Sequence, residues 1–170
     1  MHNTRRLVLL ALFIAMASVL HIVESWLPLP LPVPGIKLGL ANIISLLIIV
    51  MYGWHDAIYV AVLRVILASL FGGIFLGPAF AMSLGGAIVS IAFMNYAYLH
   101  WHPTFSVIGI SIIGAVIHNV VQIMVAATLV SSVTLLWYLP YLILFALPTG
   151  LVTGMTTHYF LMKFPSEIYR

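Results

Sequence analysis

The 170-residue chain is 64% hydrophobic and only 5% charged, with three acidic residues, six basic residues and no cysteine. Soluble domains carry about 25% charged residues, so this composition excludes a soluble globular protein and indicates an integral membrane protein. The absence of cysteine excludes disulfides, thiolate metal sites and thiol catalysis. The few cations are scattered along the chain, which argues against a nucleic-acid partner or a polybasic lipid patch.

The apolar runs and their breakers predict an all-α integral membrane protein with one domain, residues 1–170, of six transmembrane helices. A membrane crossing needs about 20 apolar residues, and the connections between the runs are short. Arg5 and Arg6 precede the first run, as in a signal peptide or a first membrane helix. We favour the helix because five further runs follow. The expected spans are approximately 7–24, 37–52, 56–71, 79–99, 107–130 and 135–162.

A proline-rich segment separates the first two expected spans. Prolines alternate there with leucine and valine, which predicts a stiff, apolar, extended loop over residues 24–34, because proline removes backbone donors and clashes with the preceding helical turn. Six spans place both termini on one side of the membrane. Because basic residues concentrate on the cytoplasmic side, cations near the termini predict that both ends are cytoplasmic and that this loop is external. These cations are Arg5, Arg6, Lys163 and Arg170.

Arg64 is the most unusual residue of the third span. It lies nine residues into an apolar run, about 14 Å along a helix at the usual rise per residue. A charge at this depth costs at least about 2.5 kcal/mol on insertion scales, so it needs a partner or an anionic ligand. The structural alternatives are an ion pair with Asp56, about 12 Å away along the same helix, and a cap on backbone carbonyls. We predict a functional or gating role.

The fifth span carries a polar stripe. Ser111, Ala115, His118 and Gln122 share one helical face, with Asn119 beside them. Hydrogen bonding between helices is the structural alternative, and such a contact contributes only about 0.6 kcal/mol on average. A histidine with two amides offers more donors and acceptors than packing requires. The stripe therefore predicts a binding site.

The second span offers a further polar set, Lys37, Asn42 and Ser45, in the outer half of the membrane. These side chains are suited to an anionic or polar group, although Lys37 at a helix end is equally explained by a lysine that extends its ammonium to the interface. No span contains paired carboxylates, and the sequence has no aspartate-rich diphosphate motif and no glycine-rich nucleotide loop. We therefore expect no enzymatic activity, no cofactor and no metal site.

Three parts of the chain carry a resemblance to a known family. The string PGIKLGLAN at residues 34–42, Arg64, and the string GAVIHNVVQ at residues 114–122 resemble the Gx transporter family, also labelled heptaprenyl diphosphate synthase component I. By this resemblance the chain is similar to the substrate-binding S components of energy-coupling factor (ECF) transporters. Those proteins are six-helix bundles that capture a small substrate from outside and pass it inward with a transmembrane coupling subunit and two ATPases. The resemblance places the chain in the plasma membrane of a prokaryote.

The resemblance also implies roles for individual residues. Ala11 and Ala15 match an Ala-x-x-x-Ala pair through which the first helix contacts the coupling subunit. The loop that contains Trp26, Pro28, Pro30, Pro32 and Pro34 occupies the position of a substrate gate. The expected function is capture of a small anionic or amphipathic substrate. The alternative is a non-catalytic membrane subunit of a polyprenyl (heptaprenyl) diphosphate synthase. The residues expected to bind the substrate are Lys37, Asn42, Arg64, His118, Asn119 and Gln122.

Overall fold

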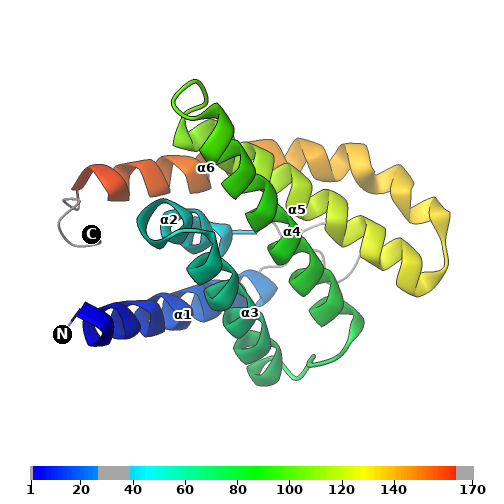
Figure 1. Cartoon of the computed structure of the whole chain (residues 1–170). Helices are drawn as coiled ribbons and strands as arrows, with labels where there is room; N and C mark the ends of the chain where they lie inside the picture. The colour runs from blue at the N-terminus through cyan, green and yellow to red at the C-terminus, as the bar shows by residue number, and fades with distance from the viewer. Residues whose placement is uncertain (1, 27–38, 164–170) are drawn as a thin grey trace.

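The computed structural model describes residues 2–26 and 39–163, and these residues form helices joined by short turns (Figure 1). The all-α fold expected from the sequence is confirmed for this part of the chain. The elements are α1 (His2–Trp26), α2 (Asn42–Tyr52), α3 (Trp54–Phe71), α4 (Pro78–Trp101), α5 (Val107–Val130), the 3-10 helix η1 (Val133–Tyr138) and α6 (Leu139–Lys163).

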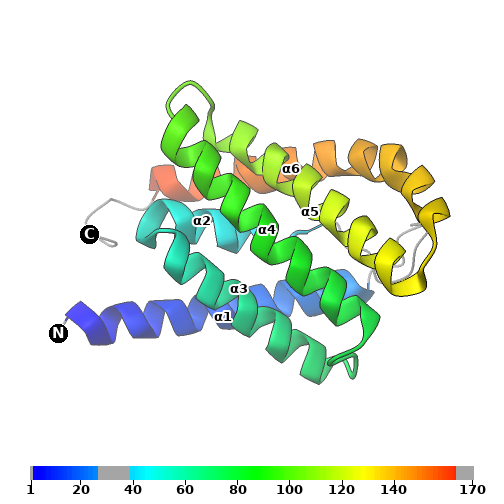
Figure 2. The same ribbon diagram turned by 45° about the vertical axis from the view of Figure 1, so that its right-hand side comes forward.

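Five stretches of the described chain are long and apolar enough to cross a membrane: 4–26, 54–71, 78–101, 107–130 and 133–163. The helix α2 has 11 residues, which corresponds to about 16 Å and is shorter than the hydrocarbon core of a bilayer, about 30 Å. A count of six spans therefore remains a prediction. The first residues of α1 and the last residues of α6 lie at the same end of the bundle in both views (Figures 1 and 2).

The short helix α2 lies at the centre of the bundle. It contacts each of the other five α-helices, and most of its residues are buried. Apart from Asn42, Ser45 and the Tyr52 hydroxyl, its sequence is apolar on every face, which is typical of a helix surrounded by other helices. A polar side chain on α2 therefore points at neighbouring helices whatever its direction. This position places Asn42 and Ser45 inside the molecule.

The helices α5 and α6 form the most extensive pairing. Glycines on α6 bring the two backbones together: a Cβ atom built at Gly150 would lie 2.7 Å from the Cα atom of Ile112, and one built at Gly154 would lie 2.7 Å from that of Ile108. Ser111 and Thr153 share a hydrogen bond of 2.6 Å across the same interface. Small residues four positions apart allow such close approach in membrane helices.

Helix α1 begins at His2, five residues before the expected span, and the starts of the second and sixth spans differ as well. Helix α2 begins at Asn42 rather than at residue 37, after Gly39 with φ +86° and a turn at Leu40 and Ala41. Glycine adopts this left-handed conformation readily, and the conformation is incompatible with a continuous α-helix. The sixth expected span divides into η1 and α6. Pro140 lies in the first turn of α6, where its missing N–H interrupts no helical hydrogen bond, so it starts the helix instead of kinking it.

Helix α1 presents one buried face and one exposed face. Phe13, Ala17, His21 and Glu24 are buried at helical spacing, whereas the expected docking pair Ala11 and Ala15 is exposed. The placement of Trp26 in an extended loop was wrong: it is the last residue of α1 and is 78% exposed. The first proline comes only at position 28, so the sequence contains no helix breaker before Trp26. The gate positions Pro28, Pro30, Pro32 and Pro34, together with Lys37, lie outside the described residues.

Candidate binding site

Arg64 is buried in the interior of α3 and is 2% exposed. Its Nη2 atom donates a hydrogen bond to Oδ1 of Asn42 at 3.2 Å, and the guanidinium also interacts electrostatically with Glu24. An ion pair between Arg64 and Asp56, the structural alternative considered from the sequence, was wrong. The Asp56 carboxylate accepts hydrogen bonds from Arg6 instead, with Nε at 3.0 Å.

Glu24 is a member of the site that the sequence analysis missed. It was expected in the outer loop over residues 24–34, but it lies in the last turns of α1 with an exposed fraction of 3%. Its carboxylate accepts a hydrogen bond from the backbone N–H of Gly39. Glu24 and Gly39, which belong to the described segments before and after residues 27–38, therefore meet at this cluster. The spacing of Phe13, Ala17 and Glu24 on one helical face is the signal that could have located the carboxylate.

The orientation of Asn42 follows from its partner. A guanidinium only donates hydrogen bonds, so the Asn42 oxygen faces Arg64 and its Nδ2 atom points the other way, towards Gly39. A Cβ atom built at Gly39 would lie 2.9 Å from Nδ2 of Asn42 and 3.5 Å from Cδ2 of His118. Gly39 thus lies next to both the Asn42 amide of α2 and the His118 ring of α5.

His118 and Gln122 form a pair on the inner face of α5. His118 Nε2 lies 3.0 Å from Gln122 Nε2, and both side chains are buried. As the Gln122 amide is placed, it donates to Nε2, which puts the imidazole proton on Nδ1. A Cβ atom at Gly86 of α4 would lie 3.0 Å from Nδ1 and 3.1 Å from Cγ of Gln122. Glycine at this position therefore leaves room for the pair between α4 and α5.

Two members of the polar stripe on α5 point to α6 instead. Asn119 donates from Nδ2 to the backbone oxygen of Leu142 at 3.2 Å, and Ser111 bonds to Thr153. The structural alternative of interhelical hydrogen bonding thus describes these two residues. Of the six residues expected to bind a substrate, the structure gathers four, Asn42, Arg64, His118 and Gln122.

Several buried polar atoms of this region have no hydrogen-bond partner among the described residues. They belong to side chains of α2, α3 and α5 and are Asn42 Nδ2, Ser45 Oγ, Arg64 Nε and Asn119 Oδ1. Buried polar atoms are nearly always paired, and an unmet one costs about 1–3 kcal/mol. The cluster therefore has hydrogen-bonding capacity beyond what the described helices use.

Comparison with known proteins gives one match. A family model described as heptaprenyl diphosphate synthase component I matches residues 13–160, which include every residue of the cluster formed by Glu24, Gly39, Asn42, Arg64, His118 and Gln122. No curated protein and no solved structure matches the chain.

Proposed function

The chain belongs to the heptaprenyl diphosphate synthase component I family, and we propose that it is a non-catalytic membrane subunit that binds a small polar molecule at the cluster around Arg64. The observation that carries this proposal is the pair of buried donors, Arg64 Nε and Asn42 Nδ2, that have no acceptor among the described residues. The long apolar helices account for a membrane location, but packing alone gives no reason to bury such donors.

The chemistry of the cluster defines the class of ligand. Both donors require an acceptor, such as a carboxylate, carbonyl or phosphoryl oxygen. Glu24 offsets the charge of Arg64 electrostatically, so a preference for an anion would rest on Lys37. The helix that carries Asn42 is otherwise largely apolar, and its residues Ile44, Leu46 and Leu47 are buried. We therefore propose a ligand with an oxygen acceptor and a compact hydrocarbon body.

Asn42→Ala and His118→Ala are each expected to lower the affinity for this ligand, and with it the retained amount, at least about fivefold, since losing a hydrogen bond to a buried polar group costs about 1–3 kcal/mol. The measurement is native mass spectrometry of the protein extracted gently from its own membrane, which reports a retained small molecule. Ser90→Ala is the matched control, because the Ser90 hydroxyl is buried and, within residues 2–26 and 39–163, bonds only to Ala87 of its own helix. Equal occupancy in all three variants would contradict the proposed site.

Within this function we propose import as an ECF-type S component. The sequence contains no nucleotide-binding motif, so uptake would require two partner ATPases and a transmembrane coupling subunit. Ala11 and Ala15 lie on the exposed face of α1 with Leu12 and Met16. This face combines small residues with apolar ones, a composition that lets a partner helix approach closely.

Ala15→Trp is therefore expected to abolish copurification of the coupling subunit and ATPases while ligand occupancy stays unchanged. Its bulk would separate the two helix backbones, and it lies on the face of α1 opposite the buried cluster. Ala92→Trp, at an exposed alanine of α4, is the matched control for the addition of an indole to a lipid-facing surface. Retention of all partners by the Ala15 variant would exclude this face as the contact.

The family name favours a second candidate function, a membrane partner of a soluble polyprenyl diphosphate synthase. Copurification separates the two functions. Recovery with a soluble synthase, and a change of its activity when this chain is removed, would favour the second, whereas recovery with ATPases favours import.

A further inference from the structure

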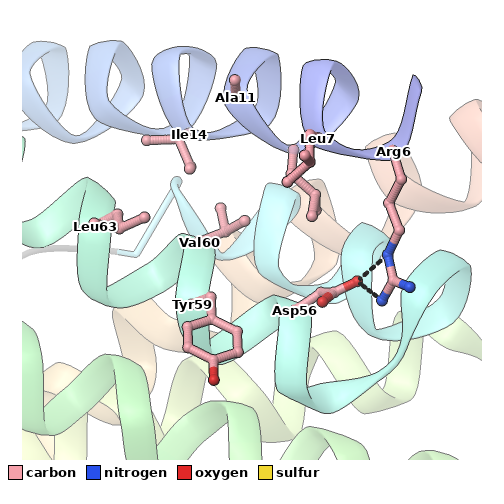
Figure 3. Close-up of a pocket in the computed structure, with 9 residues that line it drawn as sticks. Arg6, Leu7, Ala11, Ile14, Asp56, Tyr59, Val60 and Leu63 are labelled. Carbon is pink, nitrogen blue, oxygen red and sulfur yellow. Dashed lines mark hydrogen bonds and ion pairs between the residues drawn. The ribbon is translucent and has the colours of Figure 1, made fainter. Parts of the chain in front are cut away.

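A groove runs between α1 and α3, lined by residues of these two helices (Figure 3). Its volume is about 610 Å³, and its walls are almost entirely apolar. Leu7, Leu10, Ala11 and Ile14 of α1 face Tyr59, Val60 and Leu63 of α3. Several of these side chains, including Leu7 and Leu63, are exposed at the rim. The groove is therefore open to the surrounding hydrocarbon.

One end of the groove is polar. Arg6 and Asp56 form an ion pair there, while Ile14 and Leu63 lie at the other end (Figure 3). The side chain of Arg6 is 50% exposed, and Arg5 beside it is also exposed. Both arginines interact electrostatically with Tyr52 at the end of α2, as does Asp56. Arg5 is the sequence neighbour of the lining residue Arg6, so within the described part of the chain these two cations and the Asp56 carboxylate leave a single net positive charge.

We propose that the groove binds one acyl chain of a membrane phospholipid with a monoanionic headgroup, and that the headgroup phosphate lies at Arg5 and Arg6. The apolar walls match a hydrocarbon chain, and the net charge matches one phosphodiester. A diphosphate carries at least two negative charges and would exceed the single net positive charge of this end of the groove. This inference does not depend on the ligand of the Arg64 cluster.

The test uses the full-length protein stripped of lipid in a neutral detergent, with phosphatidylglycerol as the probe and phosphatidylcholine as its uncharged counterpart. Native mass spectrometry and the lipid-induced shift of the melting temperature report binding. We expect phosphatidylglycerol to bind more tightly than phosphatidylcholine. Arg5→Gln should lower the affinity for phosphatidylglycerol about fivefold, which is the effect of removing one cation at a lipid surface. The ion pair between Arg6 and Asp56 should stay intact in this variant.

Leu63→Trp, which fills the groove, should remove the tight phosphatidylglycerol adduct. The matched control for the added indole is Leu144→Trp, at an exposed leucine of α6, and the matched control for the lost cation is Lys163→Gln, at the C-terminal end of that helix. Both should bind the lipid as the wild type does. Equal affinity for the two lipids, or an unchanged adduct in the Leu63 variant, would overturn the proposal. Displacement of phosphatidylglycerol by equimolar farnesyl diphosphate would also overturn it, since it would assign the groove to a prenyl diphosphate.

Discussion

Arg64→Met is expected to lower the free energy of unfolding by about 3–5 kcal/mol, the usual loss when one member of a buried charged network is removed. Arg64 is 2% exposed, donates to Asn42 and offsets the charge of Glu24, which is 3% exposed. Methionine has a similar length but supplies no donor and no charge. The variant would therefore leave Asn42 Oδ1 without its donor and the Glu24 carboxylate without its nearby cation. Reversible unfolding in mixed detergent micelles measures the loss.

Two further variants separate charge compensation from simple packing. If Glu24 and Arg64 depend on each other, the double variant Glu24→Gln/Arg64→Met should be more stable than the sum of the single losses predicts, with a coupling energy of about 0.5–3 kcal/mol. Arg5→Met, at an exposed arginine of α1, should change stability by less than about 0.5 kcal/mol. Strictly additive single losses would show that the two side chains act independently.

Gly154→Ala and Gly150→Ala are each expected to destabilise the α5–α6 pair by about 1–3 kcal/mol, the usual cost of overpacking a close contact. The added methyl at residue 154 would lie 2.7 Å from Ile108 Cα and 2.9 Å from Ser111 Cβ. A backbone atom cannot move aside as a side chain can, so the two helices must separate. Separation would also stretch the hydrogen bond between Ser111 and Thr153.

Gly85→Ala is the matched control for these glycine substitutions. The nearest atom to a new methyl there is Cγ2 of Val125 at 3.3 Å, the end of a side chain that can adjust. Thermal unfolding should show the loss for both α6 variants and little change for the control, because alanine also favours the helix intrinsically. An α6 variant as stable as the control would mean that the interface tolerates a wider helix separation.

The sequence predicted local features of the fold well. The fifth span was expected over 107–130, and α5 has these bounds because Ser106 accepts a hydrogen bond from Gly109 N–H at one end and Ser131 adopts a left-handed conformation at the other. The burial of His118, Asn119 and Gln122 also follows from the helical period. These features depend on residues within a few positions of each other, so the sequence carries them directly.

The partners of the polar residues were not predictable in the same way. Arg64 bonds to Asn42, 22 positions away, and Glu24 bonds to Gly39, 15 positions away. Helical periodicity indicates which face of α5 is buried, but it does not indicate that Asn119 contacts α6 while His118 contacts Gly86 of α4. Those contacts depend on how each helix is rotated about its own axis relative to its neighbours. The packing of side chains from all the helices together sets these rotations.

The sequence alone determined that this protein is a membrane-embedded helical bundle, because bilayer hydrocarbon forces apolar chains into helices and its composition leaves no other class. It also located the helix breakers and the polar residues that a membrane interior should not hold without reason. Only the tertiary structure decided that Glu24, Asn42 and Arg64 share one buried cluster and that Arg6 forms an ion pair with Asp56. Pairing between distant residues depends on the packing of α1, α2 and α3, and no local pattern in the sequence encodes that packing.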